Sequence, residues 1–328
     1  MSGAPLLSVT DLRVSFATKK GTVHAVNGVT FEAKRGEIVG IVGESGCGKS
    51  QTLRAIIGLT QDPGSIDGGI VEFQGENFLQ MTPRQQRLIR GKDIGFISQS
   101  PFGALNPILS IAQQFANIIR AHRRASRREC REMSLRALQE VGIADPMRVL
   151  DGYAHELSGG MAQRVVIAMA MIHGPRLLLA DEPTTALDVT VQRQILDLIT
   201  GLISGGDRSM LLVTHDLSVV AQYCTRVVVM YAGKPVEVGD VRDVFHNPHH
   251  PYTRALLDAV PRSGGTIKGL TGTLPDVVNY PVGCPYASRC PHVTEVCREV
   301  APTMTGDGLA RAASCHHQLG EVPNRVTA

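Results

Sequence analysis

The chain has 328 residues, 43% of them hydrophobic, and a formal net charge of +3. This length suits one large domain with an appendage, or two domains. The charge is too small to indicate nucleic-acid binding by itself. The sequence contains no run of 18 apolar residues, so it predicts no membrane span, and the N-terminus lacks the pattern of a signal peptide. We therefore expect a protein that remains in the cytoplasm, where cysteines stay reduced.

The first predicted elements are strands. Leu7–Phe16 and Val23–Ala33 are rich in β-formers and predict an antiparallel sheet. Glu37–Val42 is an apolar run that leads into a glycine-rich turn, and a helix is expected from Gly48 through Leu59. Strand, glycine loop and helix in this order indicate an α/β fold. Asp62–Gly69 is rich in Gly and Asp and predicts a loop.

The middle of the chain alternates between strands and helices. Strands are predicted at Ile70–Phe73 and Ile94–Ser98, and the pattern turns helical from Ile111 to Val141. Within it, Arg120–Arg131 is strongly basic, which favours a solvated helix face over a surface near phospholipid headgroups or a membrane partner. The later predicted elements are a helix over Val165–Met171, buried strands over Leu177–Ala180 and Met210–Val213, an amphipathic helix over Val189–Ile203, and a hairpin of Val227–Tyr231 with Pro235–Gly239.

A phosphate-binding loop is predicted after the Glu37–Val42 strand. The pattern G-x-x-x-x-G-K-[ST] is met by Gly43, Glu44, Ser45, Gly46, Cys47, Gly48, Lys49 and Ser50, with Gln51 next in the helix. Its glycines let backbone N–H groups turn toward phosphates, and Lys49 places a positive charge on the β and γ phosphates. The Ser50 hydroxyl can ligate Mg²⁺, and the helix directs its positive dipole end at the anion. The loop therefore predicts binding of ATP with Mg²⁺.

Two acidic residues follow the apolar strand Leu177–Ala180. Such a strand end places Asp181 near the metal ion, through water, and Glu182 near the attacking water. After the next strand comes His215, between Thr214 and Asp216. A histidine in this position more often serves packing or solvation, but its place one strand after the acids makes it a candidate for contact with the γ-phosphate.

The run Leu157-Ser158-Gly159-Gly160-Met161 comes just before a predicted helix and ahead of the acidic strand. A phosphate-loop ATPase with this signature resembles the ABC ATPases, over about residues 7–260. The usual fifth residue of the signature is Gln, and Met161 departs from it. The resemblance implies an α/β phosphate-loop NTPase core with an antiparallel β subdomain and a helical signature subdomain.

The resemblance also implies roles for single residues. Phe16 matches the aromatic residue that stacks on adenine, and Gln99 matches the glutamine that senses Mg²⁺ and faces the membrane partner. Residues 158–160 match the signature that caps the ATP bound on another subunit. Asp188 matches the loop that crosses the dimer interface, and His215 matches the switch histidine. With Glu182 intact, the chain is expected to be an active ATPase rather than a regulatory subunit.

Composition shifts near residue 245, toward Pro, Gly and Cys. The segments Asn247–Leu256 and Pro281–Cys290 are similar to the tail of the oligopeptide, dipeptide and nickel importer ATPases. We therefore predict a nucleotide-binding domain over residues 1–245, with its helical subdomain at about 100–165. A small, irregular C-terminal extension that contains cysteines is predicted over residues 246–328.

The extension holds Cys284, Cys290, Cys297 and Cys315. Four clustered cysteines in a reducing compartment favour a metal over disulfides. Their spacing is wider than that of zinc knuckles and suits a [4Fe–4S] cluster better. The importer resemblance points the same way, although zinc and free thiols remain alternatives. Three histidines lie close by and could replace a ligand: His292, His316 and His317.

The resemblance implies the ATP-hydrolysing subunit of a bacterial importer for di- or oligopeptides, at the cytoplasmic face of the inner membrane. Its implied partners are two transmembrane permease subunits, an extracytoplasmic substrate-binding protein and a second ABC ATPase, expected to be a paralogue that forms a heterodimer. No nucleic acid is expected among them. The alternatives are nickel or another small solute as cargo, or a soluble ABC ATPase that acts on nucleic acid or ribosomes.

Overall fold

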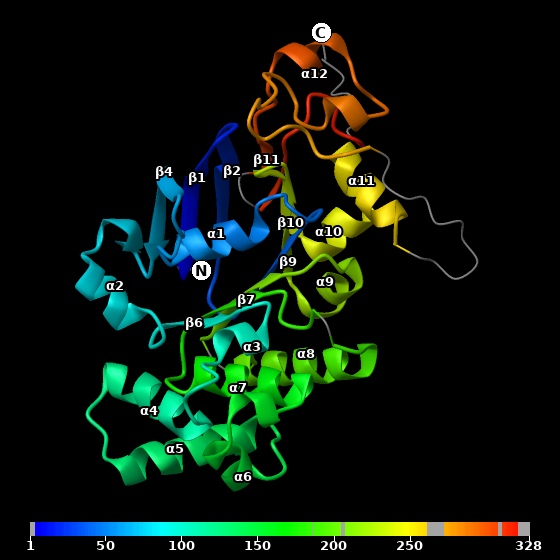
Figure 1. Cartoon of the computed structure of the whole chain (residues 1–328). Coiled ribbons are helices and arrows are strands. Elements are labelled where there is room, and N and C mark those ends of the chain that lie inside the picture. Colours follow the sequence, from blue (N-terminus) through cyan, green and yellow to red (C-terminus); the bar gives the residue numbers. More distant parts are fainter. Residues whose placement is uncertain (1–3, 186, 205–206, 261–271, 308–309, 321–328) are drawn as a thin grey trace. The chain divides into compact units, whose positions relative to one another are not determined.

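The computed structural model describes residues 4–185, 187–204, 207–260, 272–307 and 310–320. The chain forms two units, one of residues 1–80 and 213–328 and one of residues 81–212 (Figure 1). The first unit contains the phosphate loop and the cysteine-containing tail. The second contains the acidic strand and the signature. No described helix is long and apolar enough to cross a membrane.

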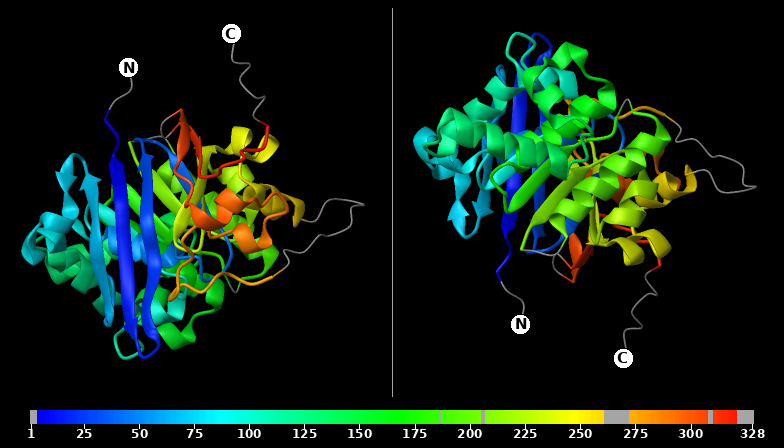
Figure 2. Two further views of the ribbon diagram at one scale, coloured as in Figure 1. Left: turned by 90° about the horizontal axis from the view of Figure 1, so that it is seen from above. Right: turned by 90° about the horizontal axis from the view of Figure 1, so that it is seen from below.

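An antiparallel sheet in the first unit is built from the start of the chain. Its strand order is β2-β1-β4-β5, and Figure 2 shows the first three strands side by side. The bounds are β1 Leu7–Thr18, β2 Gly21–Ala33, β4 Gly64–Phe73 and β5 Glu76–Asn77. The loop predicted over Asp62–Gly69 is therefore wrong from Gly64 onward. Ser65 and Ile66 pair with Ser15 and Val14 of β1, so the partner strand overrides the local composition.

A second group of strands in the first unit has the order β11-β12-β10-β9-β3. Strand β9 is parallel to β3 and antiparallel to β10, which confirms the predicted hairpin. Ala232 and Gly233 turn between them, both with positive φ. The bounds are β3 Ile38–Val42, β9 Arg226–Tyr231, β10 Lys234–Asp240, β11 Thr305–Asp307 and β12 Arg311–Ala313.

The helices of the first unit are interspersed with its strands along the chain. Helices α9 and α10 contact one another, α9 also contacts β3, and α10 contacts β9 and β10. The bounds are α1 Lys49–Ile56, α9 Leu217–Tyr223, α10 Val241–His246, α11 Pro251–Asp258 and α12 Glu295–Glu299, with short 3₁₀ turns η1 Phe78–Gln80 and η3 Ala287–Arg289.

The second unit combines three strands with a group of helices. Its strands follow the order β8-β7-β6, and β6 is parallel to β7. Helix α5 contacts α4, α6 and α7, and α7 contacts α3, α8 and β6. The bounds are β6 Ile94–Ile97, β7 Leu177–Asp181, β8 Ser209–Val213, α2 Pro83–Ile89, α3 Pro101–Ala104, α4 Ile111–His122, α5 Arg127–Glu140, α6 Pro146–Asp151, α7 Gly159–Met171, α8 Val189–Ile203 and the 3₁₀ turn η2 Ala154–Glu156.

The helical pattern from Ile111 to Val141 proves to be two helices. The chain leaves α4 at Arg123, and Ser126 starts α5 because its side chain accepts a hydrogen bond from the N–H of Glu129. Glu129 in turn accepts from the N–H of Ser126, which completes a capping box. Within the basic run Arg120–Arg131, Arg128 in the first turn of α5 is 88% exposed and pairs with Glu132, as expected for a solvated helix face.

Candidate functional site

The phosphate loop in the first unit connects β3 to α1. Lys49, the first residue of α1, is buried, and its ammonium group donates hydrogen bonds to the carbonyls of Gly43 (2.8 Å) and Glu44 (3.0 Å). Its Nζ atom also lies 3.9 Å from Sγ of Cys47. Burial of Cys47 raises the pKa of its thiol. The loop therefore curls around the lysine ammonium group, and Cys47 is an inert packing residue within it.

Two glycines of this loop cannot be replaced without displacing backbone. Gly43 has φ of 150°, and an added Cβ would lie 2.2 Å from the carbonyl oxygen of Met230. Gly48 has φ of 101°, and a Cβ there would lie 2.2 Å from the carbonyl oxygen of Ala25. Strands β9 and β2 thus press directly on the loop, which is why its pattern requires glycine at both positions.

Two further predicted site residues lie in the first unit. Phe16 is near the end of β1, where it pairs with Val23 of β2 and Gly64 of β4, and it is partly exposed. His215 is exposed in the turn between β8 and α9. That turn is fixed on both sides, because the Thr214 N–H donates to the Ile41 carbonyl and the Thr214 hydroxyl accepts from the N–H of Asp216. The His215 side chain is thereby presented at a strand end.

The acidic pair lies in the second unit. Asp181 ends the buried strand β7 and is 1% exposed, whereas Glu182 is partly exposed. Glu182 has φ of 45°, a left-handed conformation that is costly for a residue with a side chain. Its Oε2 accepts hydrogen bonds from Nε2 of Gln99 (3.1 Å) and from the hydroxyl of Thr185 (2.8 Å). The structure thus brings together Gln99 and Glu182, which are 83 positions apart, and adds Thr185, which the sequence did not single out.

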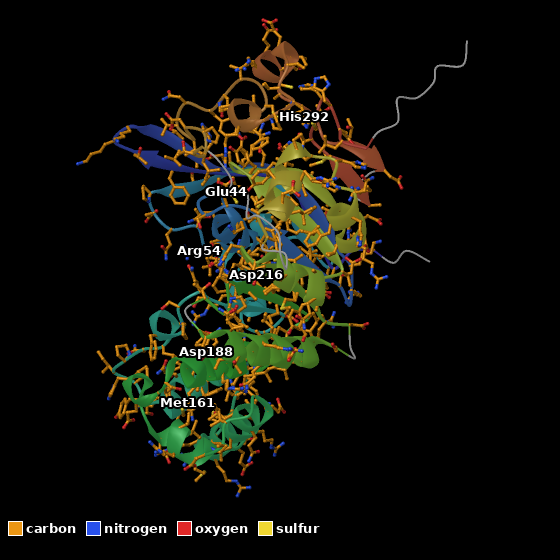
Figure 3. The ribbon with its side chains drawn as sticks, turned by 90° about the vertical axis from the view of Figure 1, so that its right-hand side faces the viewer. Glu44, Arg54, Met161, Asp188, Asp216 and His292 are labelled. Atoms are coloured by element: carbon orange, nitrogen blue, oxygen red, sulfur yellow. The ribbon has the colours of Figure 1, made fainter. Side chains whose placement is uncertain are left out.

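The signature residues begin α7, also in the second unit. The Ser158 hydroxyl caps the helix by accepting from the Met161 N–H, and the side chain is exposed. A Cβ at Gly160 would lie 3.3 Å from Val191 of α8, so the start of α7 packs closely on α8. Asp188 caps α8 in the same way, accepting from the Val191 N–H at 2.9 Å. Figure 3 labels Met161 and Asp188 at these two helix starts. The predicted signature and the residue predicted to lie at a dimer interface therefore start two helices that pack together.

The four tail cysteines line one cavity in the first unit. Cys284, Cys290, Cys297 and Cys315 share it with His292, His316 and His317 and with Tyr286. Burial raises the pKa of Cys284 and Cys290, and raises that of Cys315 to about 11. As arranged, no three His, Cys, Asp or Glu side chains in the described part of the chain form a group that could hold a metal ion. The cavity gathers the thiols without closing them into a coordination shell.

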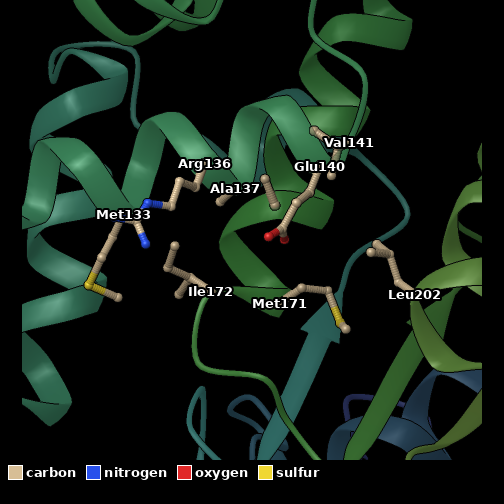
Figure 4. A pocket seen from close by; sticks show the side chains of 9 residues that line it. Met133, Arg136, Ala137, Glu140, Val141, Met171, Ile172 and Leu202 are labelled. Carbon is tan, nitrogen blue, oxygen red and sulfur yellow. The ribbon is translucent and has the colours of Figure 1, made fainter. Parts of the chain in front are cut away.

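A separate cavity lies in the second unit, between α5, α7 and α8 (Figure 4). Met133, Met171 and Leu202 supply apolar surface, and Arg136 and Glu140 are charged residues of its lining. The nine described residues that line it include none of the predicted site residues.

The comparisons with known proteins identify the family of this chain. A model of the ABC transporter family matches residues 26–185, and a model of the oligopeptide/dipeptide transporter C-terminal region matches residues 236–297. The dipeptide transport ATP-binding protein DppD of Bacillus subtilis is 46% identical over 314 residues, 94% of each chain. The oligopeptide transport ATP-binding protein OppD of Salmonella typhimurium is 44% identical over 320 residues, 97% of this chain and 95% of its own.

Among solved structures, the dimeric ATP-binding cassette MJ0796 in a post-hydrolysis state with ADP and Pi is similar, with a TM-score of 0.65. It is 28% identical and covers 72% of this chain and 99% of its own. The fold and its phosphate loop are therefore those of an ABC-type ATPase. The chain belongs to the ABC transporter ATP-binding subunits, in the oligopeptide/dipeptide transporter family.

Proposed function

We propose that this chain hydrolyses ATP to power a bacterial importer of di- or oligopeptides. The observation that carries the proposal is that whole-length relatives with 44–46% identity are peptide transport ATP-binding proteins, and that similarity includes the tail. We propose residues 1–245 as the nucleotide-binding domain, with a helical subdomain at about 100–165, and residues 246–328 as the extension. The chain then works at the cytoplasmic face of the inner membrane.

At the phosphate side of the proposed site, backbone N–H groups of residues 43–51 and the Lys49 ammonium group hold the ATP phosphates, and Phe16 stacks on adenine. Oxygen atoms of Ser50, Gln99 and Asp181 would hold Mg²⁺, a set of hard donors that suits this ion. Bound there, Mg²⁺ neutralises phosphate charge.

The proposed catalytic base is Glu182. Gln99 and Thr185 both donate hydrogen bonds to Oε2 of its carboxylate, which fixes the orientation of the group. His215 contacts the γ-phosphate in this proposal. A strained backbone at Glu182 is consistent with a site held in a reactive geometry by its surroundings.

The capping groups of the proposed site come from a second ATPase. Ser158, Gly159 and Gly160 stand at a helix N-terminus, where N–H groups and the dipole favour an anion. Asp188 lies beside them and is assigned to the same dimer interface. We propose a paralogous ATPase as this partner, together with two permeases and an extracytoplasmic binding protein, because the relatives are named as transport ATP-binding proteins.

The substitution Glu182→Gln tests the catalytic assignment. It keeps the shape of the side chain but removes its basicity, so we expect ATP to bind and trap a dimer while turnover falls by about 100-fold or more. Phosphate release and size-exclusion chromatography with ATP are the measurements. Glu132→Gln, on the exposed face of α5, is the matched control and should leave both unchanged. Undiminished phosphate release by Glu182→Gln would sink the assignment.

For the tail, we propose that Cys284, Cys290, Cys297 and Cys315 bind a [4Fe–4S] cluster. Four thiols that line one cavity supply the donor set of such a cluster. The proposed role is structural, because a cluster bound by all four cysteines would hold the segments around Cys284 and Cys315 together.

A further inference from the structure

The tail residue Arg289 lies against the phosphate loop, within the first unit. Its Nη1 atom is 2.9 Å from Oε1 of Glu44, the second residue of the loop, and the Arg289 side chain is 4% exposed. The same nitrogen donates to the Tyr231 hydroxyl at 3.2 Å. The guanidinium also lies 5.7 Å from the ring centroid of Tyr231 and 5.8 Å from that of Tyr286. Aromatic rings thus flank this ion pair, which weakens its screening by solvent.

The tail also holds the backbone of Glu44. The hydroxyl of Tyr252, a fully buried residue of α11, accepts a hydrogen bond from the Glu44 N–H at 2.9 Å. Further along the loop, a Cβ at Gly46 would lie 3.7 Å from Cδ1 of Leu274. Side chain and backbone of one loop residue are therefore both fixed by residues more than 200 positions away.

Arg289 also lies between two residues that line the cysteine cavity, Ala287 and Cys290. It ends the 3₁₀ turn η3, and Cys290 follows it directly. The N–H of Ala287 in this turn donates to the carbonyl of Cys284 at 3.0 Å. Figure 3 labels Glu44 on the phosphate loop and His292, another cavity residue, on the tail. The guanidinium that pairs with Glu44 is thus carried by the same short turn as two residues that line the cavity.

We infer that Arg289 is a positioning residue for the phosphate loop, and that it couples nucleotide binding to the conformation of the cysteine cavity. Phosphate binding requires loop N–H groups that already point inward, and the ion pair restricts the loop to fewer conformations. Coupling between two sites is reciprocal, so bound nucleotide must also stabilise the cavity wall. The inference requires no metal in the cavity and stands apart from the proposed cluster.

Substitution of Arg289 in the full-length chain tests the positioning role. We expect Arg289→Met to raise the dissociation constant for Mg-ADP by about tenfold, within the range typical of coupling between sites. The dissociation constant of Arg289→Lys should lie between those of the wild type and Arg289→Met, because lysine keeps the charge but lacks the planar guanidinium group. Arg298→Met, on an exposed residue of the same tail, should change the constant by less than about twofold.

In the assembled transporter, Arg289→Met should raise KM for ATP and leave kcat unchanged. An interaction that is equal in the ground and transition states affects binding only. A general loss of structure would lower kcat as well, and an unchanged dissociation constant in a folded variant would overturn the positioning role.

Glu44→Gln breaks the same ion pair from the loop side, so it decides the question even where Arg289→Met fails to fold. We expect it to weaken Mg-ADP binding by a similar factor. The double variant should bind as each single variant does, because the two residues act through one contact. Fully additive losses would contradict the inference.

Hydrogen exchange tests the reverse direction of the coupling. Mg-ADP should slow exchange of the amides between Cys284 and Cys290 in the wild-type chain, but not in Arg289→Met. Equal exchange with and without nucleotide in the wild type would refute the coupling. Equal slowing in the wild type and in Arg289→Met would show that the coupling does not depend on Arg289.

Discussion

At the residue scale, burial fixes the charge of His250. This residue precedes α11 and is 1% exposed. Its Nδ1 atom accepts a hydrogen bond from the Tyr252 N–H at 3.0 Å, which a proton on that nitrogen would abolish. Burial lowers the pKa of His250 to about 3. The imidazole is therefore a neutral helix cap at physiological pH rather than a cation.

The stability of the chain should fall in acid because of this one histidine. Unfolded, His250 binds a proton below its ordinary pKa of about 6.5, whereas the folded chain leaves it neutral down to about 3. His250 therefore does not lower the free energy of unfolding above about pH 6.5. Below that pH the free energy of unfolding falls, by about 2 kcal/mol at pH 5. His250→Asn keeps a neutral helix cap. Between pH 7 and pH 5, its free energy of unfolding in urea should therefore fall by about 2 kcal/mol less than that of the wild type. Equal losses in both proteins would show that other groups dominate.

At the scale of elements, short polar side chains determine where functional helices begin. Ser158, Asp188 and Asp216 each accept a hydrogen bond from a backbone N–H in the first turn of α7, α8 or α9. Ser158 belongs to the predicted signature, Asp188 to the predicted interface loop, and Asp216 follows His215 directly. A cap that satisfies the helix N-terminus also sets the direction in which the helix presents its N–H groups. The same short polar side chains that start these helices are therefore placed at or beside the predicted site residues.

Folding and function can be separated at Ser158. Aspartate is also a good cap, so Ser158→Asp should keep stability within about 0.5 kcal/mol. It places a negative charge where we propose that the partner's ATP binds, so ATPase activity of the assembled transporter should fall by at least about tenfold. Ser126→Ala, which removes the cap of α5, should cost about 1 kcal/mol and leave activity intact. Full activity in Ser158→Asp would argue against contact between the signature and the ATP bound on the partner.

At the scale of the whole molecule, the tail is fastened to the strands of the first unit. β12 pairs with β10, and the buried Glu237 of β10 accepts hydrogen bonds from the N–H groups of His249 and His250. Arg311 of β12 pairs with the same carboxylate at 3.1 Å. This pairing brings Cys315, two residues after β12, to the cavity that holds the other three cysteines.

Metal content tests whether that assembly binds a cluster. We expect the chain purified without oxygen to contain about four iron atoms and as much acid-labile sulfide. Cys315→Ser should lose most of the iron, while Cys130→Ala, a buried cysteine of α5, should retain it. A colourless, iron-free and well-folded wild-type protein would end the cluster proposal, and zinc in its place would favour the alternative metal.

Much of the fold follows from local patterns. The run Val189–Ile203 is amphipathic and forms a helix with those bounds, and the apolar run Leu177–Ala180 forms a buried strand. Two misses have different causes. Gly64–Gly69 looks like a loop but pairs with β1, a long-range contact that local composition does not record. The Ile111–Val141 pattern is broken at the capping box of Ser126 and Glu129, a local signal that the continuous helical pattern concealed.

By itself, the sequence determined the chemistry of the phosphate loop, because glycine, lysine and serine at fixed spacing act through nearby backbone. It also determined the acidic strand end, the signature and the four thiols, since each is a local run of residues. Only the tertiary structure decided that Gln99 and Thr185 hold Glu182, and that Arg289 and Tyr252 hold Glu44. Most of these contacts join positions far apart in the chain, and spacing along a sequence carries no record of which distant side chains meet after folding.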